Sequence, residues 1–453
     1  MAPKQFKKIL IANRGEIALR VIRACKEMGI STVAVYSQSD ESSLHVKLAD
    51  EAVCIGPSNP KDSYLNVANI ITAADVTGAD AIHPGYGFLS ENADFAKQVE
   101  ECGITFIGPN PAAIAAMGEK IQAKRIAQDA GVPLLAGGLR AVSGLEDALK
   151  EASHTGYPVM LKAAAGGGGR GIHVVYTPKQ LTQNFDRIQT EVSASFKSKD
   201  IYIEKYIAHP RHVEIQVLCD KHGNLIHLGE RDCTVQRRHQ KIIEESPSSI
   251  LTESVRKKMG EASLALCKLV NYDSVGTVEF LIDQDTGKYY FMEMNTRIQV
   301  EHTVTEMVTG IDLIKEQINV AAGFPLTIKQ SDVRLGSCAI ECRINAEDSV
   351  RFIPSPGLIT GVNFPGGFGV RVDSFIYTQY KVVPYYDSLV AKLICHAPTR
   401  QEAIAKMRQA LDEFVIEGIK SNLDLHRQIM RSKLFKEGDF DTHFLEEFLP
   451  KYE

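Results

Sequence analysis

Residues 291–302 read FMEMNTRIQVEH, and this stretch decides how the rest of the chain is interpreted. Glu293, Asn295 and Arg297 are two positions apart, so an extended chain directs their side chains to one side. Glu301 continues the same spacing, and the intervening residues are largely apolar. The row combines oxygen ligands for a hard cation with a guanidinium fork and a terminal carboxylate. The pattern predicts a strand that presents a binding site, and the alternative is a solvated strand face.

Length and composition place the chain among multidomain globular proteins. With 453 residues it is longer than one hydrophobic core usually serves, and 44% hydrophobic against 24% charged residues is an ordinary globular balance. The formal net charge of -5 and the pI near 6.3 provide no general attraction for nucleic acid or for an anionic membrane. Any basic site must therefore be local, and neither a nucleic acid nor a membrane is expected as a partner.

Targeting signals and disulfides are not predicted. The N-terminus carries only the short apolar run KILIA at 8–12, which is too short for a signal peptide or a membrane span. The nine cysteines are an odd number spread along the chain, which is typical of reduced thiols. Cys338 and Cys342 have no second Cys or His pair at zinc spacing, so we interpret them as packing residues. These features predict a cytoplasmic protein.

The N-terminal part predicts a doubly wound, Rossmann-like α/β domain. KILIA precedes apolar residues at helical spacing over 17–28, before Gly29 ends the helix. The alternation of strands with helices is typical of a parallel sheet. The loop HPGYGFLSEN at 83–92 suits either the mouth of such a sheet or ordinary turn chemistry. Further strand-like segments follow at 31–37, 51–56, 80–85 and 104–109.

A glycine-rich loop, AGGGGRG at 165–171, separates two strand-like segments. It formally matches GxGxxG, but a β-branched run follows where a dinucleotide fold needs a helix, and the GK[ST] of a P-loop is missing. A glycine hairpin exposes backbone N–H groups without side chains in the way. We therefore interpret the loop as a flexible cover over a polyphosphate and not as a structural turn.

Other segments supply the remaining groups of a nucleotide and metal site. Glu204 and Lys205 lie near the end of the strand-like run IYIEKYI, where a carboxylate and backbone groups suit an adenine edge. Glu279, in the strand-like run VGTVEFLID, joins Glu293 and Asn295 as oxygen donors. Magnesium prefers a few carboxylate or amide oxygens together with substrate phosphates, so this set predicts a magnesium site.

The segment ERDCTVQRRHQKIIEE at 230–245 crowds Arg237, Arg238, His239 and Lys241 together. A run of charge is usually a solvated face. Here the cations alternate with Gln and His in a chain that is acidic overall, which favours an anion pocket.

The C-terminal third predicts a strand-rich α+β domain. Strand-like segments lie at 336–345, 357–365, 369–376 and 388–396. The run TRQEAIAKMRQALDEFVI, at 399–416, has apolar residues at the spacing of an amphipathic helix that packs on a sheet.

Several motifs together resemble those of the biotin carboxylases, members of the ATP-grasp superfamily. The motifs, in chain order, are HPGYGFLSEN, MGEK, KAAAGGGGRG, EKYI with PRHVEIQ, ERDCTVQRRHQK, EMNTRIQVEH and ECRINAED. The resemblance runs from about Lys8 to about Asn422. It implies an N-terminal biotin carboxylase domain over 1–115, an ATP-grasp domain over 116–335 with a lid over about 134–206, and a C-terminal domain over 336–453.

The resemblance implies that the chain uses ATP, bicarbonate, biotin and Mg²⁺ or Mn²⁺. It assigns the catalytic roles to Lys241, Arg297, Glu301 and Arg343, the metal to Glu279, Glu293 and Asn295, and biotin contacts to Tyr86 and Arg343. It assigns bicarbonate contacts to Lys241, Arg297, Gln299, Val300, Glu301 and Arg343. It assigns nucleotide contacts to Lys120, Lys162, Gly168, Gly169, Glu204, Lys205, Tyr206, Ile207, His212, Gln236, His239, Glu279 and Glu293.

The reaction implied by the resemblance begins with deprotonation of bicarbonate, for which Glu301 is the expected base. Attack on the γ-phosphate gives carboxyphosphate and ADP. Carboxyphosphate breaks to CO₂ and phosphate under the closed lid, the phosphate takes a ureido proton, and the biotin enolate attacks CO₂. Arg343 is the expected partner of the enolate oxygen.

Partners are also implied. The chain carries no AMKM-like biotinyl-lysine motif and has no room for a carboxyltransferase, so both a biotin carboxyl carrier protein and carboxyltransferase subunits are expected as separate chains. A homodimer is expected from the prevalence of twofold symmetry. The preferred assignment is the stand-alone subunit of acetyl-CoA carboxylase in fatty acid synthesis, and the alternative is a subunit of a split pyruvate carboxylase or another acyl-CoA carboxylase. A different ATP-grasp ligase and a silent scaffold protein remain open alternatives from another class.

Overall fold

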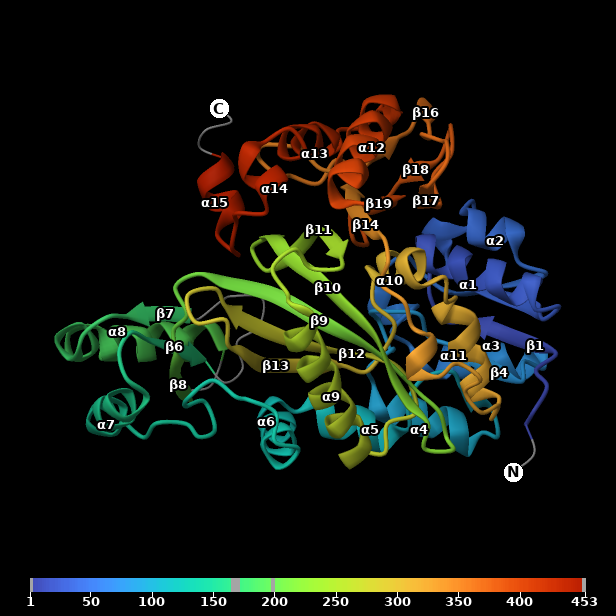
Figure 1. Cartoon of the computed structure of the whole chain (residues 1–453). Helices are drawn as coiled ribbons and strands as arrows, with labels where there is room; N and C mark the ends of the chain where they lie inside the picture. The colour runs from blue at the N-terminus through green and yellow to red at the C-terminus, as the bar shows by residue number, and fades with distance from the viewer. Residues whose placement is uncertain (1–2, 164–171, 197–199, 450–453) are drawn as a thin grey trace.

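The N-terminal domain is a parallel sheet covered by helices on both faces, as predicted (Figure 1). The computed structural model describes residues 3–163, 172–196 and 200–449. The strand order is β3-β2-β1-β4-β5, and every pair is parallel. The elements are β1 (Lys8–Ile11), α1 (Gly15–Glu27), β2 (Ser31–Ser37), α2 (Leu44–Leu48), β3 (Glu51–Gly56), α3 (Val67–Thr77), β4 (Ala81–His83), α4 (Ala93–Glu101), β5 (Thr105–Phe106) and α5 (Pro111–Gly118).

The central strand of this sheet shows why both faces are covered. Ile9 and Ile11 pack into one hydrophobic cluster with α1 and α11 (Leu313–Ala321), while Leu10 packs into another cluster with α3 and α4. Successive strand residues point to opposite faces, so an unbroken apolar run requires two apolar layers. The KILIA run therefore specifies a buried parallel strand.

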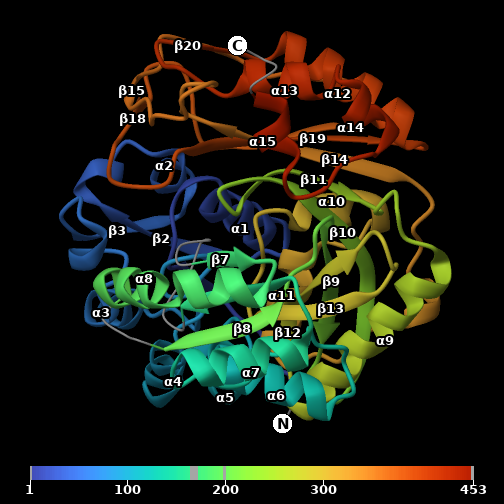
Figure 2. The ribbon, with the colours of Figure 1, turned by 90° about the vertical axis from the view of Figure 1, so that its left-hand side faces the viewer.

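A small lid lies to one side of the molecule and consists of a three-stranded sheet with two covering helices (Figure 2). The predicted pairing across the glycine-rich segment is confirmed, because Leu161 lies opposite His173 in an antiparallel pair. The predicted cover at 165–171, with Gly168 and Gly169, lies outside the described residues. The lid and its approach contain α6 (Lys120–Asp129), α7 (Leu145–Thr155), β6 (Val159–Ala163), β7 (Ile172–Val175), α8 (Pro178–Phe196) and β8 (Ile201–Lys205).

A single eight-stranded antiparallel sheet joins the rest of the chain, in the order β13-β12-β9-β10-β11-β14-β19-β17. The predicted boundary between 335 and 336 separates strands of this one sheet, because β11 pairs with β14 at Ile243 and Cys342. The domain bounds themselves stay a prediction. The elements are β9 (Pro210–Cys219), β10 (Leu225–Arg237), β11 (Gln240–Ser246), α9 (Glu253–Leu269), β12 (Ser274–Asp283), β13 (Tyr289–Asn295), α10 (His302–Thr309), β14 (Cys338–Asn345), β17 (Val370–Ser374) and β19 (Leu389–Ala397).

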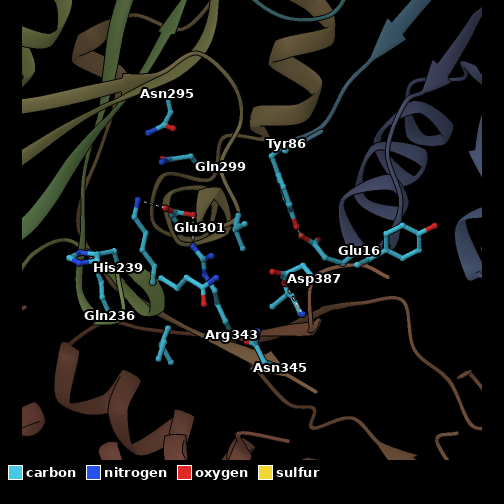
Figure 3. Close-up of a pocket in the computed structure, with 18 of the residues that line it drawn as sticks. Glu16, Tyr86, Gln236, His239, Asn295, Gln299, Glu301, Arg343, Asn345 and Asp387 are labelled. Carbon is cyan, nitrogen blue, oxygen red and sulfur yellow. Dashed lines mark hydrogen bonds and ion pairs between the residues drawn. The ribbon is translucent and has the colours of Figure 1, made fainter. Parts of the chain in front are cut away.

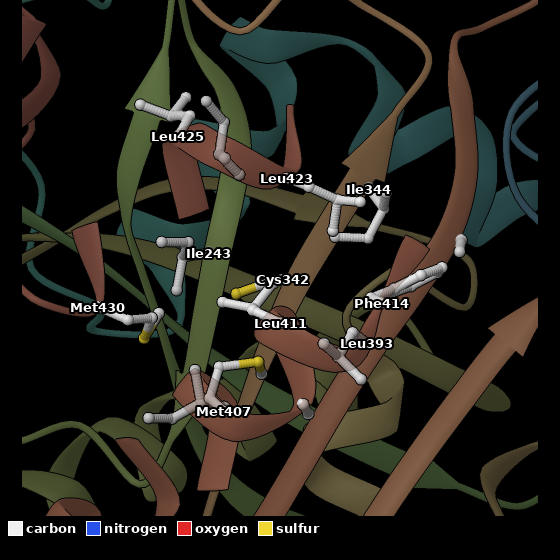
Figure 4. Close-up of a cluster of buried hydrophobic side chains, with 14 of the residues drawn as sticks. Ile243, Cys342, Ile344, Leu393, Met407, Leu411, Phe414, Leu423, Leu425 and Met430 are labelled. Carbon is white, nitrogen blue, oxygen red and sulfur yellow. The ribbon is translucent and has the colours of Figure 1, made fainter. Parts of the chain in front are cut away.

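The C-terminal domain packs its helices on its end of the shared sheet, as predicted (Figure 4). Met407 and Leu411 of the predicted amphipathic helix are buried against Cys342 and Leu393 of the strands. All nine cysteines are free, and both Cys338 and Cys342 are buried packing residues as interpreted. The remaining elements are β15 (Gly357–Leu358), β16 (Gly361–Asn363), β18 (Lys381–Val382), α12 (Arg400–Glu413), β20 (Val415–Glu417), α13 (Leu423–Ile429), α14 (Lys433–Glu437) and α15 (Phe444–Phe448).

The extended row predicted over residues 291–302 is wrong in its second half. The strand β13 ends at Asn295, and the chain then turns into α10 at His302. The backbone N–H of His302 donates to the carbonyl of Gln299 at 3.3 Å, which closes a turn. Asn295 therefore ends the strand, while Arg297, Gln299 and Glu301 lie on the turn that follows it. All four residues line one cavity. None of the described helices combines the length and apolar character that a membrane crossing needs.

Candidate active site

One cavity of about 870 Å³ brings together groups from all parts of the shared sheet and from the N-terminal domain. Figure 3 shows Glu301 and Arg343 reaching toward one another, with Tyr86 and Glu16 on the far wall. The predicted site residues that line it are Tyr86, His212, Gln236, His239, Lys241, Glu279, Glu293, Asn295, Arg297, Gln299, Val300, Glu301 and Arg343. The interpretation of residues 291–302 as solvated surface is therefore wrong, because Asn295, Gln299 and Glu301 are buried.

The proposed metal ligands lie on two paired strands at one end of the cavity. Glu279 of β12 is directly opposite Glu293 of β13. Burial raises the pKa of Glu293, and the neighbouring Glu279 raises it further. Burial alone would raise the pKa of Glu279 too, but Lys241 and His212 hold it well below its ordinary value. Two carboxylates forced side by side favour a cation between them.

The donor set in this corner fits magnesium. Asn295 donates its amide N–H to Glu279 at 2.8 Å, so its side chain lies beside this carboxylate. Glu279 also belongs to a group of potential metal ligands with His212 and Glu214, whose ligand atoms all lie within 4.8 Å of one another, and Glu293 is not in that group. Carboxylate and amide oxygens are the ligands that magnesium accepts alongside phosphate oxygens. Glu279, Glu293 and Asn295 would hold the ion.

Lys241 is the electrostatic centre of the cavity. Its ammonium lies 2.5 Å from Glu214, 2.8 Å from Glu279 and 2.7 Å from Glu301. Burial alone would lower the pKa of Lys241, but these three carboxylates hold it well above its ordinary value. The lysine is therefore fully charged and is placed to meet an anion.

Glu301 and Arg343 form the second charged contact. Arg343 Nη2 lies 2.8 Å from Glu301 and 2.6 Å from Glu244 of β11. Burial would raise the pKa of Glu301, but Lys241, Arg343 and Arg231 hold it well below its ordinary value. Burial raises the pKa of Glu244 to about 7, with Arg343 opposing that rise. Glu301 is therefore ionised between two cations.

Arg297 is oriented from outside the turn. Its Nε donates to Glu91 at 2.8 Å, and its Nη2 donates to the side-chain oxygen of Asn295 at 2.8 Å. These two hydrogen bonds fix the orientation of the guanidinium plane. Its planar fork of donors suits a carboxylate or a carbonate.

The basic segment forms a hairpin tip on the cavity rim. Arg237 pairs with Gln240, so Arg238 and His239 alone form the loop, and both have positive φ, 47° and 65°. A two-residue loop with both residues left-handed matches the twist of the strands, although neither residue favours that conformation. The hairpin returns the chain so that Lys241 points into the cavity while His239 stays exposed. Of the residues predicted for an anion pocket, Arg237, His239 and Lys241 line the cavity and Arg238 does not; binding of an anion there stays a prediction.

The predicted adenine group lies on the lid and does not border the cavity. Lys162 Nζ lies 2.5 Å from Glu204, which also contacts Lys124 closely. Lys205 donates to the carbonyls of Gly156 and Tyr157, so its ammonium serves the lid backbone. Of the other predicted nucleotide residues, Lys120 begins α6, the Tyr206 ring packs edge-on against Tyr176, and Ile207 is buried.

Several residues that support the cavity from behind its lining were missed by the sequence analysis. Arg231 is fully buried and bonds Glu214, Gln216, Thr277, Gln299 and Thr305, so it fixes the underside of the site. Glu214, Arg231 and Glu91 lie inside motifs that the resemblance rests on, PRHVEIQ, ERDC and HPGYGFLSEN. For Glu214 and Arg231, charge within a strand was the available signal, whereas Glu91 lies in a loop.

The fold and the cavity define an ATP-grasp ligase: a parallel-sheet domain and a three-stranded lid flank an antiparallel sheet, and clustered carboxylates of that sheet line the cavity. Residues 5–114 match the N-terminal domain of biotin carboxylase, residues 119–329 match the ATP binding domain of the carbamoyl-phosphate synthase L chain, and residues 341–447 match the biotin carboxylase C-terminal domain. The chain belongs to the biotin carboxylase family.

The chain is similar to known relatives and to solved structures over nearly its full length. The chain is 56% identical over 444 residues to biotin carboxylase 1 of Bacillus subtilis, covering 98% of this chain and 99% of the relative. It is 49% identical over 444 residues to a pyruvate carboxylase subunit of Methanothermobacter thermautotrophicus, covering 98% and 90%. The solved biotin carboxylase domain dimer of Hydrogenobacter thermophilus 2-oxoglutarate carboxylase, in complex with MgADP, ADP and bicarbonate, has a TM-score of 0.93 and 50% identity, covering 99% of each chain.

Proposed function

We propose that this protein carboxylates biotin on a separate carrier protein, using ATP and bicarbonate. One observation carries the proposal: Lys241 contacts both Glu279, a proposed metal ligand, and Glu301, a proposed bicarbonate contact. We call the two ends of the cavity at these carboxylates the metal corner and the anion corner. The two corners are therefore adjacent in one cavity, which is the arrangement that transfer of a phosphoryl group to bicarbonate requires.

Nucleotide and metal would occupy the end of the cavity nearest the lid. Glu279, Glu293 and Asn295 hold magnesium, which neutralises charge on the phosphates when bound. Lys120 and Lys162 are assigned to the phosphates or the adenine, and Glu204 with the following backbone is assigned to the adenine edge. Glu204 is buried between two lysines, which keeps its carboxylate ionised and orients it as an acceptor.

Bicarbonate would enter between Lys241, Arg297 and Glu301. A depressed pKa makes Glu301 a weak base in the ligand-free protein. An anion that takes over the bonds from Lys241 and Arg343 removes their attraction from Glu301, and the carboxylate then regains basicity toward the bound proton. Deprotonated bicarbonate attacks the γ-phosphate and gives ADP and carboxyphosphate, which breaks to CO₂ and phosphate.

Biotin would complete the reaction at the Arg343 wall. The phosphate accepts the ureido N–H proton, the resulting enolate attacks CO₂, and Arg343 stabilises the enolate oxygen. Glu244 holds the Arg343 fork at 2.6 Å, so its orientation does not depend on substrate. Tyr86 borders the same wall and is assigned to the biotin ring.

A wild-type assay tests the proposal directly. Phosphate release from MgATP should require bicarbonate and rise with free biotin, and carboxybiotin should form in step with phosphate. ATP hydrolysis that is indifferent to bicarbonate would point to another ATP-grasp ligase, and the absence of any hydrolysis would point to a scaffold protein.

The parent complex is proposed to be acetyl-CoA carboxylase, acting in the first half-reaction of fatty acid synthesis. The full-length similarity to biotin carboxylase 1 of Bacillus subtilis supports this assignment, and the similarity to the pyruvate carboxylase subunit of Methanothermobacter thermautotrophicus supports the alternative. We also propose a homodimer, in line with the dimeric relative. A pull-down from the native source should recover a biotinylated carrier together with a carboxyltransferase, whose acyl acceptor then identifies the complex.

A further inference from the structure

A buried lysine beneath the cavity contacts the backbone of the turn that carries Glu301. Lys392 of β19 has no exposed surface, and its ammonium lies 2.9 Å from the carbonyl oxygen of Val300. Lys392 is also directly opposite Arg343 on the neighbouring strand. Lys392 does not line the cavity, whereas Val300 does, so the ammonium contacts the turn on the side away from the cavity.

One carboxylate, that of Glu16, connects the Lys392 ammonium to Tyr86, which is assigned to biotin. Glu16, in the first turn of α1, lies 3.1 Å from Lys392. Oε1 of Glu16 also accepts a hydrogen bond from the Tyr86 hydroxyl (Figure 3). The contacts Tyr86, Glu16, Lys392 and Val300 thus form one continuous chain from the N-terminal domain to the turn before Glu301.

Charge balance shows that Lys392 remains an ammonium in this position. Burial would lower its pKa, but Glu16, Glu341 and Asp373 more than offset burial and raise it. Burying an ion costs several kcal/mol before its partners repay the cost. An apolar side chain would fill the same space without that cost, but it could not hold the Val300 carbonyl.

We propose that Lys392 is a positioning residue that holds the Val300–Glu301 peptide for bicarbonate and couples that turn, through Glu16, to the Tyr86 wall. The inference rests on the proposed function, because it assigns the two ends of the contact chain to bicarbonate and biotin. A contact chain alone is only a spatial argument, and a double-mutant cycle is the direct test of coupling.

The cycle combines Lys392→Met with Tyr86→Phe and measures KM for bicarbonate and KM for ATP in the full chain. Each single variant should raise KM for bicarbonate by about tenfold, the size expected for losing a hydrogen bond to a charged group. The double variant should stay within about twofold of the larger single effect, because either change breaks the same chain. KM for ATP should stay within about twofold, since the lid contacts are untouched; a structural collapse would shift both constants.

Lys8→Met is the matched control. Lys8 also pairs with a carboxylate, Glu51 at 2.6 Å, and donates to a carbonyl, Thr77 at 2.7 Å, but it lies in the N-terminal sheet away from the cavity. It should leave both constants unchanged. If Lys392→Met does not fold, Glu16→Gln replaces it in the cycle, because the amide keeps an acceptor for Tyr86 but removes the charge that Lys392 pairs with.

Three outcomes are distinct. The positioning inference is overturned if KM for bicarbonate is unchanged in Lys392→Met, or if the effects of the two single variants multiply in the double variant. Wild-type activity in either case leaves the proposed function intact. Wild-type protein without bicarbonate-dependent ATP hydrolysis overturns the proposed function itself. A raised bicarbonate constant without multiplication in the double variant supports both.

Discussion

Lys241 and Glu301 are 60 residues apart in sequence, yet the lysine ammonium lies 2.7 Å from the glutamate carboxylate. The same ammonium also neutralises Glu214 and Glu279. One cation therefore balances both Glu279, a proposed metal ligand, and Glu301, a proposed bicarbonate contact, and a ligand bound at either carboxylate must compete with it.

Glu301→Gln should separate nucleotide binding from turnover. The amide keeps the size of the side chain but cannot take a proton, so bicarbonate-dependent phosphate release should fall by about a hundredfold or more, as for a positioned base. ATP binding, followed by calorimetry, should change by less than about threefold because the lid contacts are intact. A phosphate release rate within a few fold of wild type would remove Glu301 from the role of base.

Lys241→Met should strengthen metal binding in the absence of nucleotide. The ammonium lies 2.8 Å from Glu279, and removing a positive charge this close to a metal ligand lowers the repulsion on an incoming cation. Mn²⁺ affinity, measured from the electron paramagnetic resonance of the free ion, should rise by roughly tenfold. Lys162→Met, which loses a contact to Glu204 and none to Glu279, is the control and should leave Mn²⁺ affinity unchanged.

Glu244→Gln should change the pH dependence of stability. Burial raises the pKa of Glu244 from 4.5 to about 7, so between these values the folded protein binds more protons at this position than the unfolded chain. Stability from this group is therefore present below pH 4.5 and is lost as pH rises toward 7.

The glutamine variant does not titrate and keeps an acceptor for Arg343. Its Tm relative to wild type should therefore rise by at least about 2 °C between about pH 5 and about pH 8. The exposed Glu41→Gln controls for the loss of one charge and should show no such trend. A constant difference between Glu244→Gln and wild type across the range would contradict the assignment.

The sequence predicted the strands and the parallel sheet well because each depends on local patterns. The runs at 8–12 and 31–37 contain the observed strands β1 and β2, and the helix expected over 17–28 is α1. The two strands flanking the glycine-rich segment also pair as expected, because a short glycine-rich loop between two strand-like runs favours a hairpin.

The turn at the end of β13 and the charge network could not be predicted in the same way. Arg297 is held by Glu91, 206 residues earlier, and only the packed domains bring these two together. The tip at Arg238 and His239 lacks the Asn-Gly signal of a left-handed turn. The alternating pattern predicted a strand that continues to Glu301. In the structure the strand ends at Asn295, and the chain then forms a turn closed by the hydrogen bond from His302 to Gln299.

Gly138→Ala should weaken ATP binding through Glu204. Gly138 has a φ of +76°, and a Cβ placed there would overlap the Glu204 carboxyl and its Cγ. Glu204 is buried and fixed by two lysines, so it must shift away from the position assigned to the adenine edge. We expect KM for ATP to rise by roughly tenfold, as for a hydrogen bond lost to misplacement, while KM for bicarbonate is retained.

Gly131→Ala isolates this effect from backbone strain. Gly131 has a φ of +72°, close to that of Gly138, but a Cβ there meets nothing within 4 Å. Both variants should lose about 1 kcal/mol of stability to backbone strain, since a left-handed residue other than glycine is strained in each, and Gly138→Ala should lose more because Glu204 must also shift. Only Gly138→Ala should alter KM for ATP. Equal ATP constants in the two variants would mean that Glu204 does not contact the nucleotide, because the strain is shared and the overlap is not.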